Sequence, residues 1–108
     1  SSAKAPVKFH FVFPSSYARM REVQKALVDE IEARRYDEES QFAIKLALEE
    51  GLINAIKHGN KLDPNKNVTV DAEVSNHLFS IKIQDQGNGF QRADVPDPTD
   101  EANLDKPS

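Results

Sequence analysis

The chain has no cysteine, so it forms no disulfide and uses neither a thiolate metal ligand nor a cysteine nucleophile. It also lacks any apolar run close to the ~20 residues that a membrane-spanning helix needs. Its first residues lack a basic stretch followed by an apolar segment, which is the pattern of a secretory signal. We therefore expect a cytoplasmic protein with no membrane partner.

Dense basic runs are absent as well. The chain has 14 Lys and Arg against 18 Asp and Glu, and its formal net charge is -4. Proteins that neutralise nucleic-acid phosphates usually concentrate basic residues on one face, so we expect no direct nucleic-acid partner. The 108 residues are enough for one modest core, so residues 1–108 are expected to form a single domain.

Alternating apolar residues predict three strands. The first is predicted over Val7–Phe13, the second over Val68–Val74 and the third over Phe79–Ile83. Ser75 and Asn76 are turn formers between the second and third strands, so these two strands are expected to form an antiparallel hairpin.

Two helices are predicted between the first strand and the hairpin. The first begins near Ser16 and ends near Tyr36, and its core positions recur every three or four residues: Met20, Val23, Leu27 and Ile31. The second is predicted from the capping residue Asp37 to a C-cap at Gly59. It has apolar residues on two sides, which predicts packing on both: Ile44, Leu48, Leu52 and Ala55 on one side, and Phe42, Leu46 and Ile53 on the other.

This order of elements predicts an α+β fold. We expect a two-layer sandwich with the helices packed on one face of a mixed, mostly antiparallel sheet. Residues 91–108 are rich in proline and acidic residues and poor in apolar ones, which predicts a mobile segment.

Three polar residues form a ridge on the second predicted helix. Glu50, Asn54 and His58 are spaced four residues apart and therefore share one edge of the helix. The neighbouring positions carry small residues that leave room for a ligand: Ala43, Ala47 and Gly51. The ridge indicates either a ligand site or an ordinary polar edge, and the helix alone does not decide between them.

A carboxylate follows the third predicted strand. Asp85 continues the face of the strand that carries Phe79, Ile81 and Ile83, and this face is expected to point into the core. A carboxylate there needs a partner, so Asp85 either caps a turn or accepts a hydrogen bond at the floor of a pocket. Gly87 and Gly89 favour a turn with positive φ and a close approach of the backbone to a ligand.

Together the two motifs resemble those of a known superfamily. Glu50-x-x-x-Asn54-Ala55-x-x-His58-Gly59 is similar to the N box, and Asp85-x-Gly87-x-Gly89-Phe90 to the first glycine box, of the gyrase, histidine kinase and MutL type of ATPase. Within that superfamily the chain resembles the anti-sigma-factor serine kinases of the RsbW and SpoIIAB type, over residues 7–108. The resemblance implies a Bergerat ATP-binding fold, with ATP and Mg²⁺ as cofactors.

The resemblance also implies a role for each site residue. Asp85 would accept a hydrogen bond from the adenine amino group, Asn54 would bind Mg²⁺, and Glu50 would act as the general base. The remaining members of the implied ATP site are His58, Gly59, Gly87, Gly89 and Phe90. His58 and Gly59 would border the phosphates, although a His near a helix end also commonly interacts with the helix dipole.

The chain departs from the family pattern at its C-terminal side. The implied ATP lid would start near residue 91, and the second glycine-rich box that holds the triphosphate would follow it. This box is absent from the sequence, so we expect the C-terminal part of the domain to be missing.

The resemblance implies a kinase with two competing protein partners. One would be a sigma factor and the other a STAS-type anti-anti-sigma protein that the enzyme phosphorylates on serine, and the kinase itself would be a homodimer. Two alternatives share the nucleotide motifs: a nucleotide-binding regulatory module without kinase activity, and the catalytic ATPase domain of a histidine kinase.

Overall fold

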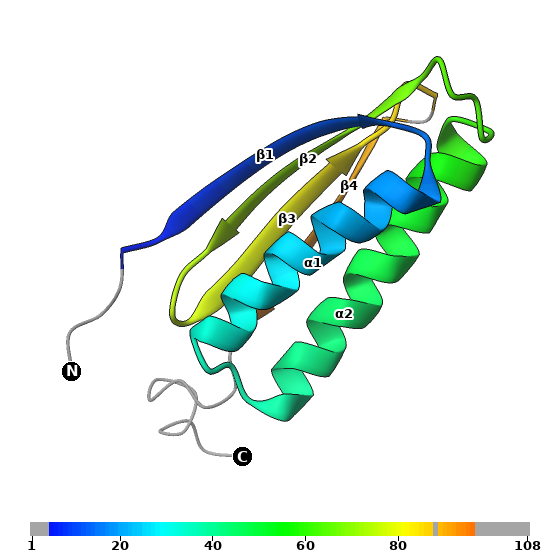
Figure 1. Cartoon of the computed structure of the whole chain (residues 1–108). Helices are drawn as coiled ribbons and strands as arrows, with labels where there is room; N and C mark the ends of the chain where they lie inside the picture. Colours follow the sequence, from blue (N-terminus) through cyan, green and yellow to red (C-terminus); the bar gives the residue numbers. More distant parts are fainter. Residues whose placement is uncertain (1–4, 88, 97–108) are drawn as a thin grey trace.

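In the part of the chain that the structure describes, four strands form one sheet, and two long helices cover one of its faces. The computed structural model describes residues 5–87 and 89–96. The elements follow in the order β1 (Val7–Pro14), α1 (Tyr17–Ala33), α2 (Glu38–Ile53), η1 (Asn54–Gly59), β2 (Asn67–Val74), β3 (Leu78–Gln84) and β4 (Phe90–Pro96). Figure 1 shows α1 and α2 side by side beneath the sheet, with η1 extending α2 towards one end. The predicted α+β two-layer fold is confirmed.

The strands lie in the order in which they occur along the chain. Each of the described strands pairs antiparallel with the next, in the order β1-β2-β3-β4. Phe13 pairs with Val68, and Val70 with Ile83, so the apolar sides of neighbouring strands face the same way. This register follows from the period-two pattern, because a shift by one residue would turn each apolar face into water.

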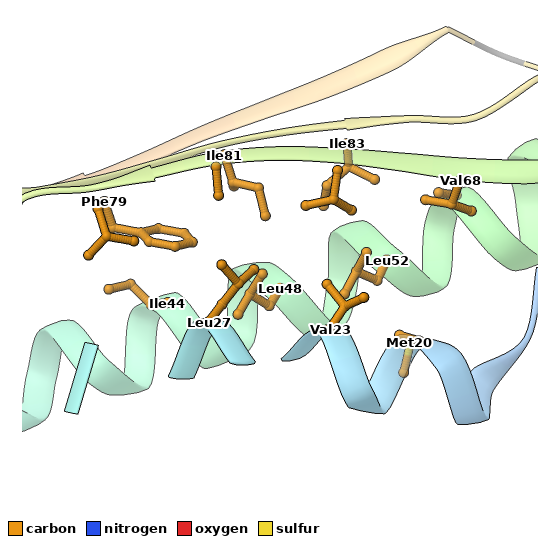
Figure 2. Packing of buried hydrophobic residues seen from close by; sticks show 14 of the residues in the cluster. Met20, Val23, Leu27, Ile44, Leu48, Leu52, Val68, Phe79, Ile81 and Ile83 are labelled. Atoms are coloured by element: carbon orange, nitrogen blue, oxygen red, sulfur yellow. The ribbon is translucent and has the colours of Figure 1, made fainter. Parts of the chain in front are cut away.

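The core lies between the sheet and the two helices. The predicted core residues of α1 are all buried. Figure 2 shows side chains from α1 and α2 pointing towards the sheet, among them Leu27 and Leu48, with Phe79 of the sheet facing them. Asp37 caps α2 as predicted, because its carboxylate accepts a hydrogen bond from Ser40 N at 2.8 Å.

Two details of the helices differ from the prediction. α1 ends at Ala33 rather than near Tyr36, because Arg34 caps it and Arg35 has a left-handed φ of 60°. The second apolar side of α2 is not packed throughout: Phe42 is 67% exposed and Leu46 48% exposed. These two side chains point away from the described layers, since α2 contacts the sheet and α1 with its other side.

The chain also forms a strand that the sequence pattern did not predict. Residues 91–96 were expected to be mobile and to belong to a lid, but they continue β4 and pair with β3. The prediction is wrong for these residues because only Ala93 and Val95 are apolar on the face of β4 that points to the helices. Such a short alternating pattern is a weak strand signal beside acidic residues and proline. As an edge strand β4 tolerates a terminal proline. The rest of the predicted lid, residues 97–108, lies outside the described residues.

A buried arginine ties three segments together at the end of α1. The Arg34 side chain is 0% exposed and donates hydrogen bonds to Glu30 Oε2 at 2.7 Å, Asn76 Oδ1 at 2.9 Å and the Ala5 carbonyl at 2.7 Å. The contacts join the helix end to the start of β1 and to the turn between β2 and β3.

Replacing Arg34 with Ala is expected to destabilise the domain by about 3–5 kcal/mol, because it leaves Glu30 and two other acceptors at a buried site without their donor. Urea unfolding followed by circular dichroism measures the loss. Lys25→Ala is the control, since it removes an exposed pair with Asp29 on the same helix and should change little. Equal losses in the two variants would contradict a structural role of the buried guanidinium.

Neither helix in the described part of the chain has the length and apolar character required to cross a bilayer.

Candidate functional site

The second helix does not continue as an α-helix to Gly59. It changes at Asn54 into the π-helical turn η1, in which Asn60 N donates to the Ala55 carbonyl at 2.8 Å. Wide turns of this kind are rare, and they occur frequently at functional sites. Here the π-helical turn carries Asn54, His58 and Gly59 of the predicted site.

Gly59 is a glycine for a different reason from the one predicted. The left-handed residues after the helix are Lys61, with φ 54°, and Leu62, with φ 61°, so Gly59 is not a left-handed cap. Instead the Asp85 carboxylate lies directly over it: a Cβ at Gly59 would lie 2.2 Å from Asp85 Oδ2. A side chain at position 59 would therefore displace Asp85.

The loop after β3 is folded tightly around Asp85. Asp85 Oδ1 accepts a hydrogen bond from Gly87 N at 2.7 Å, and Asp85 N donates to the Gly89 carbonyl at 2.9 Å. Gly89 has a φ of 101°, as expected for a glycine-dependent turn. The predicted positive φ is wrong for Gly87, which is instead needed for a close approach, since a Cβ there would lie 2.0 Å from the Gly59 carbonyl oxygen. Asp85 thus has the turn-forming role that was one of its two predicted interpretations.

Asp85 also lines a pocket, which was the other interpretation. A hollow of about 260 Å³, the first hollow, lies between η1 and the sheet end and is lined by Asn54, His58, Asp85, Phe90 and Gln91. The structure therefore brings residues from both motifs together at one site. Phe90 is 57% exposed, and Lys82 Nζ lies 4.6 Å from the centroid of its ring.

A second hollow adjoins the first along the helix. It has a volume of about 210 Å³ and shares Asn54 and Gln91 with the first hollow; Glu50, Gly51 and Arg92 are among its other lining residues. The Gln91 side chain crosses from β4 to α2, where its Nε2 donates to the Gly51 carbonyl at 3.3 Å. Each hollow is smaller than the ~300–1,000 Å³ of a typical ligand pocket, and the two share part of their lining.

The predicted ridge is therefore split between the two hollows. Glu50 lines the second, His58 lines the first, and Asn54 lies at their junction. All three side chains are exposed, so they are accessible to a ligand. Gly59 and Gly87 line neither hollow. Gly59 leaves space for the Asp85 carboxylate, and Gly87 N donates a hydrogen bond to Asp85 Oδ1.

The donor set suits ATP with Mg²⁺ better than a metal ion held by protein alone. No group of three or more His, Asp or Glu side chains that could hold a metal ion occurs in residues 5–87 and 89–96. Mg²⁺ usually takes one or two protein oxygens and completes its shell with phosphates and waters. The exposed Asn54 carboxamide offers an oxygen of that type.

Sequence reasoning missed three glutamine and asparagine residues at this site. The sequence pattern places Gln91 in a mobile segment and gives Gln86, between Asp85 and Gly87, no role of its own. It gives Asn60 no role either, yet this residue is fully buried. Its position next to Gly59, at the end of the N-box-like motif, is the signal that could have identified it.

The fold and the meeting of the two motifs are those expected of the ATPase class that the motifs resemble. The family model of the histidine kinase-like ATPase domain matches residues 13–108. The match covers most of the chain, so the chain belongs to this family. No curated protein matches it in a sequence search.

Proposed function

We propose that this domain binds Mg-ATP in the two hollows and transfers the γ-phosphoryl group to a serine of a partner protein. The observation that carries the proposal is the first hollow, where Asn54 of the helix motif and Asp85 of the strand-end motif line the same space. Membership of the ATPase family supports the nucleotide. Transfer to serine is supported by the resemblance to anti-sigma-factor kinases.

Each side chain has a role that its chemistry allows. The Asp85 carboxylate accepts a hydrogen bond from the adenine amino group in the first hollow, and Gly59 leaves space for that carboxylate. Asn54, at the junction of the hollows, supplies an oxygen to Mg²⁺, which offsets the negative charge on the phosphates. His58 and Phe90, which line the first hollow, border the nucleotide, and Gly87 and Gly89 shape the loop that holds Asp85.

Glu50 is the general base of the proposed reaction. It lines the second hollow, next to Asn54 and beyond the adenine end. Glu50 accepts the proton of the serine hydroxyl as the serine oxygen attacks the γ-phosphorus. The bond from that phosphorus to the β–γ bridging oxygen then breaks, and ADP leaves with the electron pair.

The proposed partners are a sigma factor and a STAS-type antagonist, bound by a homodimer of the domain. Phosphorylation adds about two negative charges to the antagonist, which is enough to expel it from an interface by repulsion and desolvation. The sigma factor then takes its place. This assignment rests on the resemblance to anti-sigma-factor kinases.

Calorimetric titration of the 108-residue chain with Mg-ATP and Mg-ADP tests the nucleotide site. Asp85→Ala is expected to weaken binding at least about tenfold, because a hydrogen bond to a charged group contributes about 1.5–3 kcal/mol. Asp94→Ala is the matched control: it also removes an aspartate, but one that contacts Ser80 on the outer face of the sheet.

Wild-type affinity in Asp94→Ala together with loss in Asp85→Ala would support the adenine site. Failure of the wild-type chain to bind either nucleotide would contradict the proposed function.

A further inference from the structure

Asn60 is a buried polar residue directly after the π-helical turn. It is 0% exposed, and its side chain makes three hydrogen bonds. Nδ2 donates to Ser15 Oγ at 3.0 Å and to the Asn67 carbonyl at 2.9 Å, and Oδ1 accepts from Gln86 N at 2.8 Å. Both Nδ2 hydrogens are used, so the orientation of the carboxamide is fixed by its donors and its acceptor.

These partners belong to three separate parts of the fold. Ser15 lies between β1 and α1, and its hydroxyl donates to the Lys66 carbonyl at 2.8 Å. Asn67 is the first residue of β2, and Gln86 belongs to the loop that holds Asp85. Asn60 therefore connects the loop that holds Asp85 to the end of β1 and the start of β2.

The hydrogen bond from Gln86 N to Asn60 Oδ1 joins the Asp85 loop to the end of η1. Gln86 is attached at a second point, because its side-chain carbonyl accepts a hydrogen bond from Asn67 N. On either side of Gln86, the Asp85 carboxylate and Gly87 both lie against Gly59. The loop backbone between these contacts is bound to a buried carboxamide, so a shift of the loop away from Gly59 would strain the bond from Gln86 N to Asn60 Oδ1.

We propose that Asn60 is a positioning residue of the nucleotide site, which holds the Gln86 backbone and thereby keeps the Asp85 carboxylate in the first hollow. The effect on nucleotide binding rests on the proposed function, whereas the effect on the loop does not. If Asn60 instead had a purely structural role, its hydrogen bonds would stabilise the junction of β1, α1 and β2 without affecting the position of Asp85.

Ser15→Ala separates these two roles. It removes the hydroxyl that bonds Asn60 and Lys66, so it weakens the same buried network while leaving the bond to Gln86 intact. Asn60→Ala removes all three side-chain bonds. If Asn60 is a positioning residue, only the second variant should release Asp85.

The experiment measures Mg-ADP affinity and melting temperature in the 108-residue chain and both variants. Asn60→Ala is expected to bind Mg-ADP at least about tenfold more weakly than Ser15→Ala at a temperature where both variants are fully folded. The melting temperatures identify that temperature. Equal affinities in the two variants would overturn the proposal. Asn60→Asp, which keeps the acceptor for Gln86 N but loses both donors, should bind more tightly than Asn60→Ala.

Amide hydrogen exchange tests the loop without a nucleotide. Gln86 is an exposed loop residue, so slow exchange of its N–H in the wild-type chain would reflect the bond to Asn60. Exchange of Gln86 N–H at the rate of a solvated loop amide would overturn the proposal even if no Asn60 variant folds. If the wild-type chain does not bind Mg-ADP, the proposed function fails, and the exchange rate alone decides whether Asn60 holds the loop.

Discussion

Glu50→Gln is expected to lower phosphoryl transfer by about 10²–10⁴-fold while leaving Mg-ADP affinity within a few-fold of wild type. Glutamine keeps the size and the polar end of the side chain but does not accept the serine proton. Glu50 lines the second hollow and Asp85 the first, so the role proposed for the Glu50 carboxylate is in the chemical step and not in adenine binding. Loss of rate without loss of binding is the signature of a group that acts in the transition state.

The measurement needs both quantities in the same preparation. Transfer is followed by mass spectrometry as phosphorylation of a STAS-type antagonist from the same organism, and Mg-ADP binding is followed by calorimetry. Glu49→Gln is the matched control, because Glu49 is the adjacent exposed glutamate and accepts a hydrogen bond from Gln24 at 3.3 Å on the α1 side. Glu49→Gln should keep the wild-type rate of phosphoryl transfer and the wild-type affinity for Mg-ADP.

The other outcomes point to different functions. Equal loss of binding and transfer in Glu50→Gln would mean that Glu50 contributes to nucleotide binding and does not act as the general base. Full transfer in this variant would remove Glu50 as the base. If the wild-type chain binds Mg-ADP but phosphorylates nothing, either transfer needs the second glycine-rich box that this sequence lacks, or the chain is a nucleotide-binding regulatory module or the ATPase domain of a histidine kinase.

Much of the fold was predictable because periodic apolar residues decide which faces are buried. The α1 core positions repeat at helical spacing and are all buried, and the strands of the hairpin alternate as predicted. β4 was missed for the converse reason: its inward face carries only Ala93 and Val95, so pairing with β3 matters more than its own pattern. Phe42 and Leu46 were predicted to be packed, but periodicity does not specify how many sides of a helix have a neighbour.

The candidate site was predictable in its residues but not in its construction. The helical spacing of Glu50, Asn54 and His58 placed them on one edge, although the π-helical turn within that spacing has no clear sequence signal. The roles of Gly59 and Asn60 depend on the Asp85 loop, which is distant in sequence. Contacts between distant segments of this kind are not contained in a local pattern.

The second large effect is expected at Gly87. A Cβ at this position would lie 2.0 Å from the Gly59 carbonyl oxygen, and because that atom belongs to the backbone of η1, the loop itself has to move. Gly87 N also holds Asp85 Oδ1, so a shift of the loop carries the carboxylate out of the first hollow. Gly87→Ala is therefore expected to weaken Mg-ADP binding at least about tenfold, which corresponds to losing about 1.4 kcal/mol or more.

Gly89→Ala separates this steric effect from backbone strain. Gly89 has a φ of 101°, but a Cβ at this position would have none of the described atoms within 4 Å, so alanine there meets strain without a clash against η1. Strain of this kind costs about 1–3 kcal/mol. If close approach to Gly59 positions Asp85, Gly87→Ala should lose more Mg-ADP affinity than Gly89→Ala at a similar loss of melting temperature. The reverse order would mean that the turn conformation at Gly89, rather than the contact between the loop and η1, decides where Asp85 lies.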